Sequence, residues 1–401
     1  MNHIKSISLI FSIFLIALVN ISSAKAQNRF SDVAFDELNN RRKAADLPEL
    51  IRDTNLDNSA GAHVNYITAN SSLMTEGHLE APGKKGFSGV TPEQRMRKFG
   101  YSSIASGENY SMISFPVGSL STTNLIDAPY HRESQFGMFK DAGVGMGIQI
   151  APSGSVNREQ YVYVINFGNK STIKVAANYL FTYPVQNQKN VTADWVVNET
   201  PNPLPEMNGK RVGYPISIAA APGNKLEVKS FTLTSADQVI SESRLITTNT
   251  QSQKKLESYA FLIPIKPLSY DSTYQAQVIG TINGINFIKE WSFTTRKKLP
   301  LKLIPSSSGL AGASKSELNV QITGGTGNGY VIYSVRQSFN IDDQGTSGKG
   351  ISLYSVEYPA PDSIKLIRNT TPCSYPISDC ELVVSGRDSS GDEITLGSPI
   401  Y

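Results

Sequence analysis

This sequence of 401 residues contains few cysteines and histidines, and its net charge is small. There are two cysteines and four histidines, and 37 basic residues nearly balance 34 acidic ones. A nearly neutral chain lacks the basic surface that nucleic acid or an anionic membrane would require. We therefore expect no nucleic acid among its partners.

Catalytic signatures are missing as well. The sequence contains no Gly-x-Ser-x-Gly elbow, no His-Glu-x-x-His helix and no catalytic cysteine pattern. Catalytic triads can arise without a sequence motif, so this weakens the case for a hydrolase without excluding one. Whether the chain is an enzyme stays open at this point.

The first 26 residues are typical of a secretory signal peptide. Lys5 precedes an apolar run over Ile7 to Val19, and Ala24-Lys25-Ala26 forms a small-residue cleavage site. Removing residues 1–26 leaves a net charge near +1, from 35 basic and 34 acidic residues. No later apolar run is long enough to span a bilayer. We therefore expect a secreted or periplasmic protein with no transmembrane segment in the mature chain.

Both cysteines, Cys373 and Cys380, lie near the C-terminus with six residues between them. In an exported chain such an isolated pair is typical of a small disulfide loop. The alternative is a two-cysteine metal site, but no histidine follows His131 to complete it. We favour the disulfide.

The pattern of the chain changes character along its length. Residues 27–170 mix helical and strand periodicity, and residues 171–205 contain prolines typical of a connector. Two regions, 206–297 and 298–401, then show short strand patterns separated by turn residues, which is typical of β-sandwiches. The sequence thus predicts a multidomain protein.

Polar candidates gather around one predicted helix. Thr91-Pro92-Glu93-Gln94 is a capping-box start for a helix that ends near Phe99, and His78 and Glu108 lie in Gly-rich turns on either side of it. Alternation along an extended segment would place Glu80 on the same side as His78. His131, in an Ala-Pro-Tyr-His-Arg run, is a further candidate. We expect His78, Glu80, Glu108 and His131 to line one binding cleft.

These features together resemble the CAP superfamily of cysteine-rich secretory, antigen-5 and pathogenesis-related-1 proteins, in its bacterial form. The resemblance covers about residues 30 to 168. Its order and spacing are carried by Leu38, Asn39, Arg41, Leu47, Leu50, Leu56, Ala60, His63, His78, Gly107-Glu108-Asn109, His131-Arg132, Gly143-Val144-Gly145 and the strand over Tyr161 to Gly168. The resemblance implies an α-β-α sandwich with an open cleft.

Many members of that family place two histidines and two acidic residues in the cleft, where they can hold a divalent metal. By motif, His78 and Glu108 carry over as the first histidine and the glutamate. The second acidic position falls near Ala128, and Gln160-Tyr161-Val162-Tyr163 stands where the second histidine motif would be. The resemblance therefore leaves two interpretations, a weakly bound zinc on His78 and Glu108 or no cofactor.

Several of these residues also have structural interpretations. His63 lies on the apolar stripe of the predicted helix over 55–69, where a buried core histidine is more common than a ligand. Glu108 can accept backbone N–H groups and fix its loop, and the His131-Arg132 pair can hold a helix end to the sheet. We therefore leave both interpretations open.

A second resemblance concerns the middle of the chain. The segment Pro267 to Tyr274, followed by Trp291-Ser292-Phe293-Thr294-Thr295, is similar to bacterial immunoglobulin-like domains, whose last strand often ends in such a sequence. The expected fold class is thus a CAP-like α-β-α sandwich followed by two β-sandwich-like domains.

Three classes of function remain. The first is an extracellular binding or adhesion module for a lipid, a glycan or a cell-wall component, which immunoglobulin-like appendages favour by analogy. The second is a peptidase-like or esterase-like hydrolase that uses His78 and Glu108 for acid–base chemistry. The third is a secreted effector that acts on other cells, for which the sequence offers no test.

Overall fold

The computed structural model describes residues 30–70, 77–113, 118–153, 156–236, 238–250, 256–297, 299–305, 317–325, 330–339, 354–360, 363–368, 380–388 and 393–400. The chain divides into two compact units. The first unit comprises Met1–Ile126 and Ser134–Lys174, and the second comprises Asp127–Glu133 and Val175–Tyr401. The signal peptide expected over residues 1–26 lies outside the described residues.

Two helices of the first unit, α2 and α3, begin within a residue or so of the predicted positions. A helix over residues 30–44 is followed by α2 (Thr54–Ala69), α3 (Pro92–Lys98) and α4 (Gly118–Asp127). The Asp53 carboxylate caps α2, and the Thr91 hydroxyl caps α3, as its sequence predicts. The next helix, α5 (Pro129–Gln135), spans the boundary, because residues 127–133 group with the second unit.

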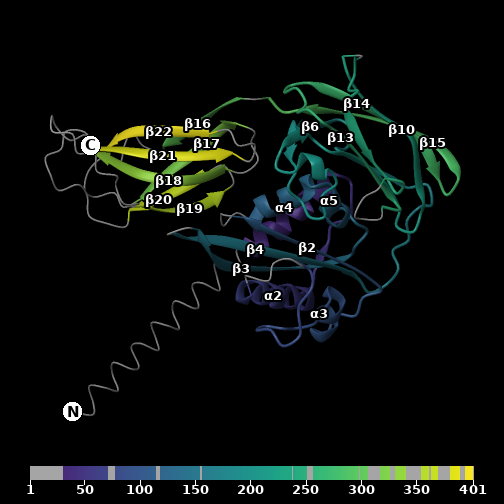
Figure 1. The fold of residues 1–401 in the computed structure, drawn as a ribbon, viewed down its shortest axis with the longest axis horizontal. Helices are drawn as coiled ribbons and strands as arrows, with labels where there is room; N and C mark the ends of the chain where they lie inside the picture. The colour runs from purple at the N-terminus through teal and green to yellow at the C-terminus, as the bar shows by residue number, and fades with distance from the viewer. Residues whose placement is uncertain are drawn as a thin grey trace, which may run out of the picture. The chain divides into compact units, whose positions relative to one another are not determined.

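A four-stranded sheet forms the centre of the first unit (Figure 1). Its strand order is β1-β3-β4-β2, with the β3–β4 hairpin in the middle. β1 runs parallel to β3, while β2 runs antiparallel to β4. The bounds are β1 Ile51–Arg52, β2 Ala105–Ile113, β3 Asp141–Ser153 and β4 Val156–Asn169.

Helices cover both faces of this sheet. Tyr110 on β2 packs against a buried cluster that includes Ala60 and Val64 of α2. The next residue along the strand, Ser111, contacts Ser121 of α4 instead. Successive side chains of a strand point to opposite faces, so α2 and α4 lie on opposite sides of the sheet. Figure 1 shows α3 on the same side as α2.

Glycines in β3 bring α2 unusually close to the sheet. A Cβ atom added to Gly143, Gly145 or Gly147 would lie 2.2, 2.4 or 2.5 Å from the nearest atom of α2. For Gly143 and Gly145 that atom belongs to the helix backbone, so no side chain fits at either position. This close contact fixes the height of α2 above the sheet, and with it the position of the buried polar side chains between them.

Glu108 lies in a strand rather than in the predicted turn. It is the fourth residue of β2, where it pairs with Asn166 of β4. Gly107 suggested a turn, but the register between β2 and β4 continues unbroken from Ala105 to Ile113. The correction has a consequence for the site, because a strand holds the Glu108 carboxylate more rigidly than a loop would.

The second unit is rich in β-sheet and begins earlier than predicted. One sheet has the order β11-β10-β14-β15-β6, another has the order β12-β13-β9-β5, and β7 pairs with β8. The prediction of a connector over residues 171–205 was wrong, because this segment contains β5, β6 and β7, which pair with other strands. The prolines of this segment lie between short strands and do not mark a linker.

The strands of this part have the following bounds: β5 Leu180–Tyr183, β6 Gln188–Val191, β7 Asp194–Val196, β8 Arg211–Gly213, β9 Ile216–Ala220, β10 Leu226–Ser235, β11 Gln238–Val239, β12 Ser243–Ile246, β13 Tyr259–Pro264, β14 Thr273–Ile282 and β15 Ile285–Thr295. A single 3-10 turn, Pro205–Met207, accompanies them among the described residues. Residues 206–297, where the sequence shows short strand patterns, contain β10, β13, β14 and β15 among their strands.

Two further sheets follow, with the orders β16-β17-β20-β19 and β18-β21-β22. Their strands are β16 Leu299–Pro305, β17 Glu317–Gly325, β18 Tyr330–Phe339, β19 Tyr354–Ala360, β20 Ser363–Arg368, β21 Cys380–Asp388 and β22 Glu393–Ile400. Cys380 begins β21, but Cys373 lies outside the described residues, so the disulfide stays a prediction. In the described part of the chain, no helix is long and apolar enough to cross a membrane.

Candidate functional site

The predicted pair of His78 and Glu108 is in direct contact. His78 lies in a turn that follows α2 in the sequence, and its Nδ1 is 3.0 Å from Oε1 of Glu108 on β2. The two side chains differ in burial, since 40% of the His78 side chain is exposed against 1% for Glu108. Tyr110 packs edge-on against the imidazole, with 5.2 Å between ring centroids. The pair thus has one buried member and one that reaches the surface.

Arg95 is the main partner of Glu108, and the sequence did not single it out. Its Nη2 lies 2.8 Å from each oxygen of the Glu108 carboxylate, and its side chain is fully buried. The Asn166 amide adds a third donor, because its nitrogen lies 2.8 Å from Oε2 when its oxygen accepts from Ser59. Glu108 is therefore a buried carboxylate surrounded by donors.

These donors decide the ionisation of Glu108. Burial by itself would raise its pKa, but the hydrogen bond from His78 and the positive charge of Arg95 outweigh that effect and hold the pKa below the usual value. A carboxylate held in this way is a weak base. Glu108 therefore orients His78 and stays ionised, and it does not itself take up a proton near neutral pH.

Glu80 forms the second half of the same network. Its Oε1 lies 3.0 Å from Nδ1 of His63, and its Oε2 accepts from the backbone N–H of Ser88 at 2.6 Å. The Ser88 hydroxyl is 3.1 Å from both oxygens. Burial raises the pKa of Glu80, but the hydrogen bonds from His63 and Ser88 and the charge of Arg95 lower it by more. The Glu80 side chain is buried, so it stabilises the site through His63 and does not itself reach the surface.

His63 connects the two carboxylates. Besides its contact with Glu80, its Nε2 lies 2.9 Å from the carbonyl oxygen of Gly77 and 3.8 Å from Oε1 of Glu108. Both ring nitrogens of His63 are therefore engaged with oxygen atoms of the network. His63 is a buried histidine, as its place on the apolar stripe predicted.

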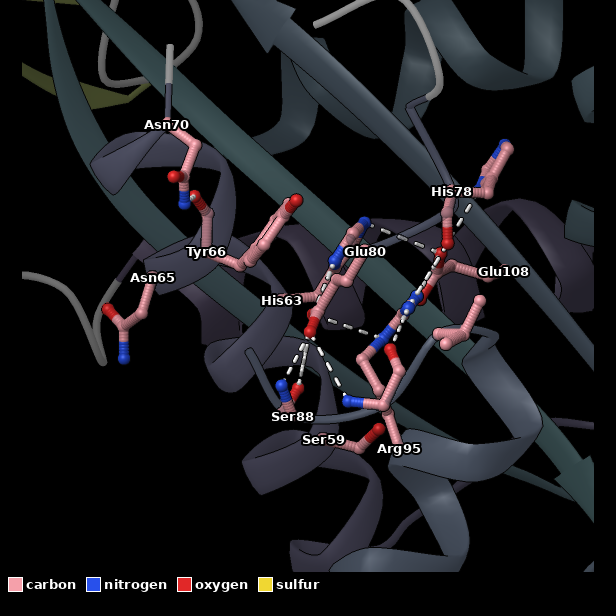
Figure 2. A network of polar contacts seen from close by, with 12 residues as sticks. Ser59, His63, Asn65, Tyr66, Asn70, His78, Glu80, Ser88, Arg95 and Glu108 are labelled. Atoms are coloured by element: carbon pink, nitrogen blue, oxygen red, sulfur yellow. Dashed lines mark hydrogen bonds and ion pairs between the residues drawn. The ribbon is translucent and has the colours of Figure 1, made fainter. Parts of the chain in front are cut away.

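Figure 2 shows these five side chains joined by dashed contacts between α2, α3 and β2. We call His63, His78, Glu80, Arg95 and Glu108 the polar network. Arg95 joins its halves, because its Nε is 3.6 Å from Glu80 and its Nη1 donates to the carbonyl oxygen of His78 at 3.1 Å.

A divalent metal does not fit this arrangement. Arg95 already lies against both carboxylates, and both oxygens of Glu108 face it. Both nitrogens of His63 are engaged, one with Glu80 and the other with the carbonyl oxygen of Gly77. Among the described residues, no three His, Cys, Asp or Glu side chains are grouped so that they could hold an ion. The expectation of a zinc ion on His78 and Glu108 is therefore unsupported by the donor geometry.

The structure gives His131 a different partner. Residues 127–133 group with the second unit, and there His131 Nδ1 lies 2.9 Å from Oε2 of Glu199. Glu199 also accepts from the backbone N–H of Tyr130, at 3.1 Å. The prediction that His131 belongs with His78 was based on sequence order alone, and Glu199 is 68 residues away in sequence. We therefore leave His131 out of the candidate site.

Of the residues that sequence analysis missed, Arg95 is the most important. α3 carries three basic residues, of which Arg95 is buried while Arg97 and Lys98 are not. A short helix with three basic residues gives little indication of which one faces inward. Arg95 and Arg97 both adjoin Met96, the only apolar residue between Pro92 and Lys98, so nearness to that residue does not distinguish them.

Comparison with known proteins adds no assignment. No family model matches the sequence, and no curated protein matches it. Among solved structures, the fibronectin(III)-like modules of Clostridium thermocellum CbhA are 10% identical, with a TM-score of 0.23, over 55% of this chain and 94% of that one. A chimeric titin Z1Z2 is 12% identical, with a TM-score of 0.27, over 56% of this chain and 97% of that one.

A third structure, the endo-fucoidan hydrolase MfFcnA9 from glycoside hydrolase family 107, is 10% identical, with a TM-score of 0.23, over 46% of this chain and 31% of that one. At such low identities and TM-scores, nothing about the function of this chain follows from these likenesses. The candidate site is therefore judged by its own geometry.

Proposed function

We propose that this chain is a secreted or periplasmic binding or adhesion protein whose first unit is a CAP-like domain. Its ligand would be a lipid, a glycan or a cell-wall component, and the β-rich second unit would present or attach the binding unit. This assignment combines the sequence resemblance with the geometry of the polar network.

The observation that supports binding is the rigid mounting of a half-exposed imidazole. His78 is fixed by Glu108, which is in turn fixed by Arg95, so little conformational freedom remains to be lost when a ligand binds. The same segments carry exposed apolar side chains: Leu79, the residue after His78, is 45% exposed, and Met112, on the same face of β2 as Glu108, is 38% exposed. A fixed polar group next to apolar surface suits a lipid headgroup or the face of a sugar.

One observation favours the hydrolase alternative. A carboxylate bonded to Nδ1 of a histidine leaves Nε2 to act as a base, which is the arrangement used in catalytic triads. His78 and Glu108 have that arrangement. In such a reaction His78 would take a proton from water or a substrate hydroxyl, and Glu108 would orient the ring.

A binding screen with mature protein decides between the two. We expect retention of one class among lipid extracts, glycans and cell-wall fragments, and weaker retention by His78→Ala. Lys84→Ala, an exposed position in the following loop, is the matched control and should bind like the wild type. Hydrolysis of generic peptide or ester substrates that disappears in His78→Ala would instead support the hydrolase.

A further inference from the structure

Many members of the family that this chain resembles can hold a metal in the cleft, yet the polar network has its own positive charge, on Arg95. We propose that Arg95 takes the place that a divalent metal ion would have, so that the site of His78 and Glu108 is metal-independent. This inference does not depend on the proposed function, because it concerns how the site is held together and not what it binds.

Burial and distance make Arg95 part of the site rather than a surface ion pair. Its side chain is 0% exposed, and those of Glu80 and Glu108 are 0% and 1% exposed. Both Glu108 oxygens are 2.8 Å from one guanidinium nitrogen. Charged hydrogen bonds of this length in a water-poor environment are strong, and removing either partner leaves an uncompensated buried charge.

The ligand set argues the same way. Arg95 already places a positive charge against both buried carboxylates, 2.8 Å from Glu108 and 3.6 Å from Glu80. A zinc ion would add two positive charges to this buried group and would have to displace Arg95 from Glu108. Of the four ring nitrogens of His63 and His78, three have hydrogen-bond partners among the described residues. The fourth, Nε2 of His78, is left as a ligand, and one such ligand holds zinc weakly.

Arg95 also positions the turn that carries His78. Its Nη1 donates to the carbonyl oxygens of His78 and Gly89, at 3.1 and 3.4 Å, while Nη2 holds Glu108. A metal ion could neutralise Glu108 but could not donate these hydrogen bonds to carbonyl groups. The planar fork of donors that arginine carries is therefore suited to this place, and the single ammonium group of a lysine would reach fewer of the acceptors. We treat Arg95 as a positioning residue.

Zinc titration of the full-length chain is the first test. We expect wild type and Glu108→Gln to respond alike to micromolar and millimolar zinc, in both calorimetry and thermal melting. Stoichiometric zinc binding by the wild type that Glu108→Gln loses would overturn the proposal, because it would show that Glu108 is a metal ligand.

The second test separates charge compensation from packing. Arg95→Met keeps most of the side-chain volume and should lower the melting temperature strongly, whereas Arg97→Met, at an exposed position on the same helix, should not. The double variant Arg95→Met/Glu108→Gln should recover part of the loss, because it also removes the unpaired negative charge. If the double variant melts no higher than Arg95→Met, Arg95 acts through packing and the proposal fails. Should Arg95→Met not fold, folding of the double variant alone supports the proposal, and failure of both contradicts it.

Discussion

At the scale of single residues, the two carboxylates of the polar network favour the ionised form. Glu80 and Glu108 both have a lowered pKa although both are buried, because donors from several different segments face them. Such groups link stability to pH. The direction of that link follows from the sign of the shift.

We predict that the first unit loses stability in mild acid. A carboxylate whose pKa is lower in the folded than in the unfolded chain stabilises the fold above the unfolded pKa, near 4.5, and this contribution is lost as pH falls through the folded pKa. Each unit of pKa difference corresponds to about 1.4 kcal/mol. Thermal melting from about pH 7 to about pH 3, the range that includes carboxyl titration, measures the loss.

Glu80→Gln should reduce this dependence and lower stability at neutral pH by about 3 kcal/mol, because His63 would lose its carboxylate partner and Arg95 would keep only Glu108. Glu49→Gln is the control, since Glu49 has a 57% exposed side chain. If the melting temperature of Glu80→Gln falls with decreasing pH as steeply as that of the wild type, the role assigned to Glu80 is contradicted.

At the scale of elements, the contact between α2 and β3 sets the position of His63 relative to Glu108. The glycines of β3 permit this contact. In α2, the backbone of Gly61 lies at the contact, but a side chain at Gly61 would point away from it. A Cβ at Gly145 would lie 2.4 Å from the backbone of Ala60, whereas a Cβ at Gly61 would meet nothing within 4 Å. The two glycines therefore have opposite expected effects.

We predict that Gly145→Ala destabilises the first unit by about 1–3 kcal/mol, because the helix must move away from the sheet. Gly61→Ala should stabilise it by about 0.5–1 kcal/mol, because alanine has a higher helix propensity than glycine in the interior of a helix. Chemical denaturation of both variants measures the difference. Equal effects would mean that the close approach of α2 does not constrain the sheet.

The elements also show where local patterns suffice. Thr91-Pro92-Glu93-Gln94 fixed the start of α3, because a capping box is a local interaction. Glu108 was placed in a turn, because Gly107 is a local turn signal, but the pairing of β2 with β4 joins residues far apart in the sequence and outweighs it. Local chemistry predicted helix starts, and long-range pairing decided the strand.

At the scale of the whole chain, the boundary between the units is not a simple cut. Residues 127–133 group with the second unit although they lie within the segment that resembles a CAP domain. Arg132 is fully buried there, donates to the carbonyl oxygen of Pro215 at 2.7 Å, and stacks over the rings of Tyr183 and Tyr214 at 5.0 and 5.1 Å. These partners all follow residue 175.

We therefore predict that a fragment of residues 27–170 is less stable than the same region in the full chain, because Arg132 would lose those partners. Solubility and thermal melting of the fragment measure this. Arg132→Gln removes the charge that has lost these partners. The fragment with this substitution should therefore have a higher melting temperature than the unchanged fragment. If the fragment has the same melting temperature as the full chain, the partners of Arg132 contribute little to the stability of this region.

Limited proteolysis tests the boundary itself. Because β5, β6 and β7 are paired with other strands, we expect the first cuts between residues 170 and 179 rather than in the prolines that follow. N-terminal sequencing of the fragments locates the cut. Early cleavage between residues 184 and 205 would contradict the pairing of these strands.

The sequence by itself determined the elements and half of the site. Periodicity and capping placed α2 and α3, and strand patterns indicated the β-rich character of residues 206–297. The motifs of His78 and Gly-Glu-Asn, taken with the resemblance, were enough to predict that His78 meets Glu108. These inferences rest on interactions within a few residues, or on a spacing that a resemblance supplied. They did not require knowledge of which faces pack together.

Only the tertiary structure decided what surrounds that pair. Whether Arg95 or Arg97 turns inward depends on how α3 sits on β2, and whether His63 meets a carboxylate depends on how closely α2 approaches β3. Glu199 beside His131 requires contact across 68 residues. Charge balance in a buried site is a property of all the neighbours together, so no local pattern could predict that a guanidinium would occupy the place expected for a metal.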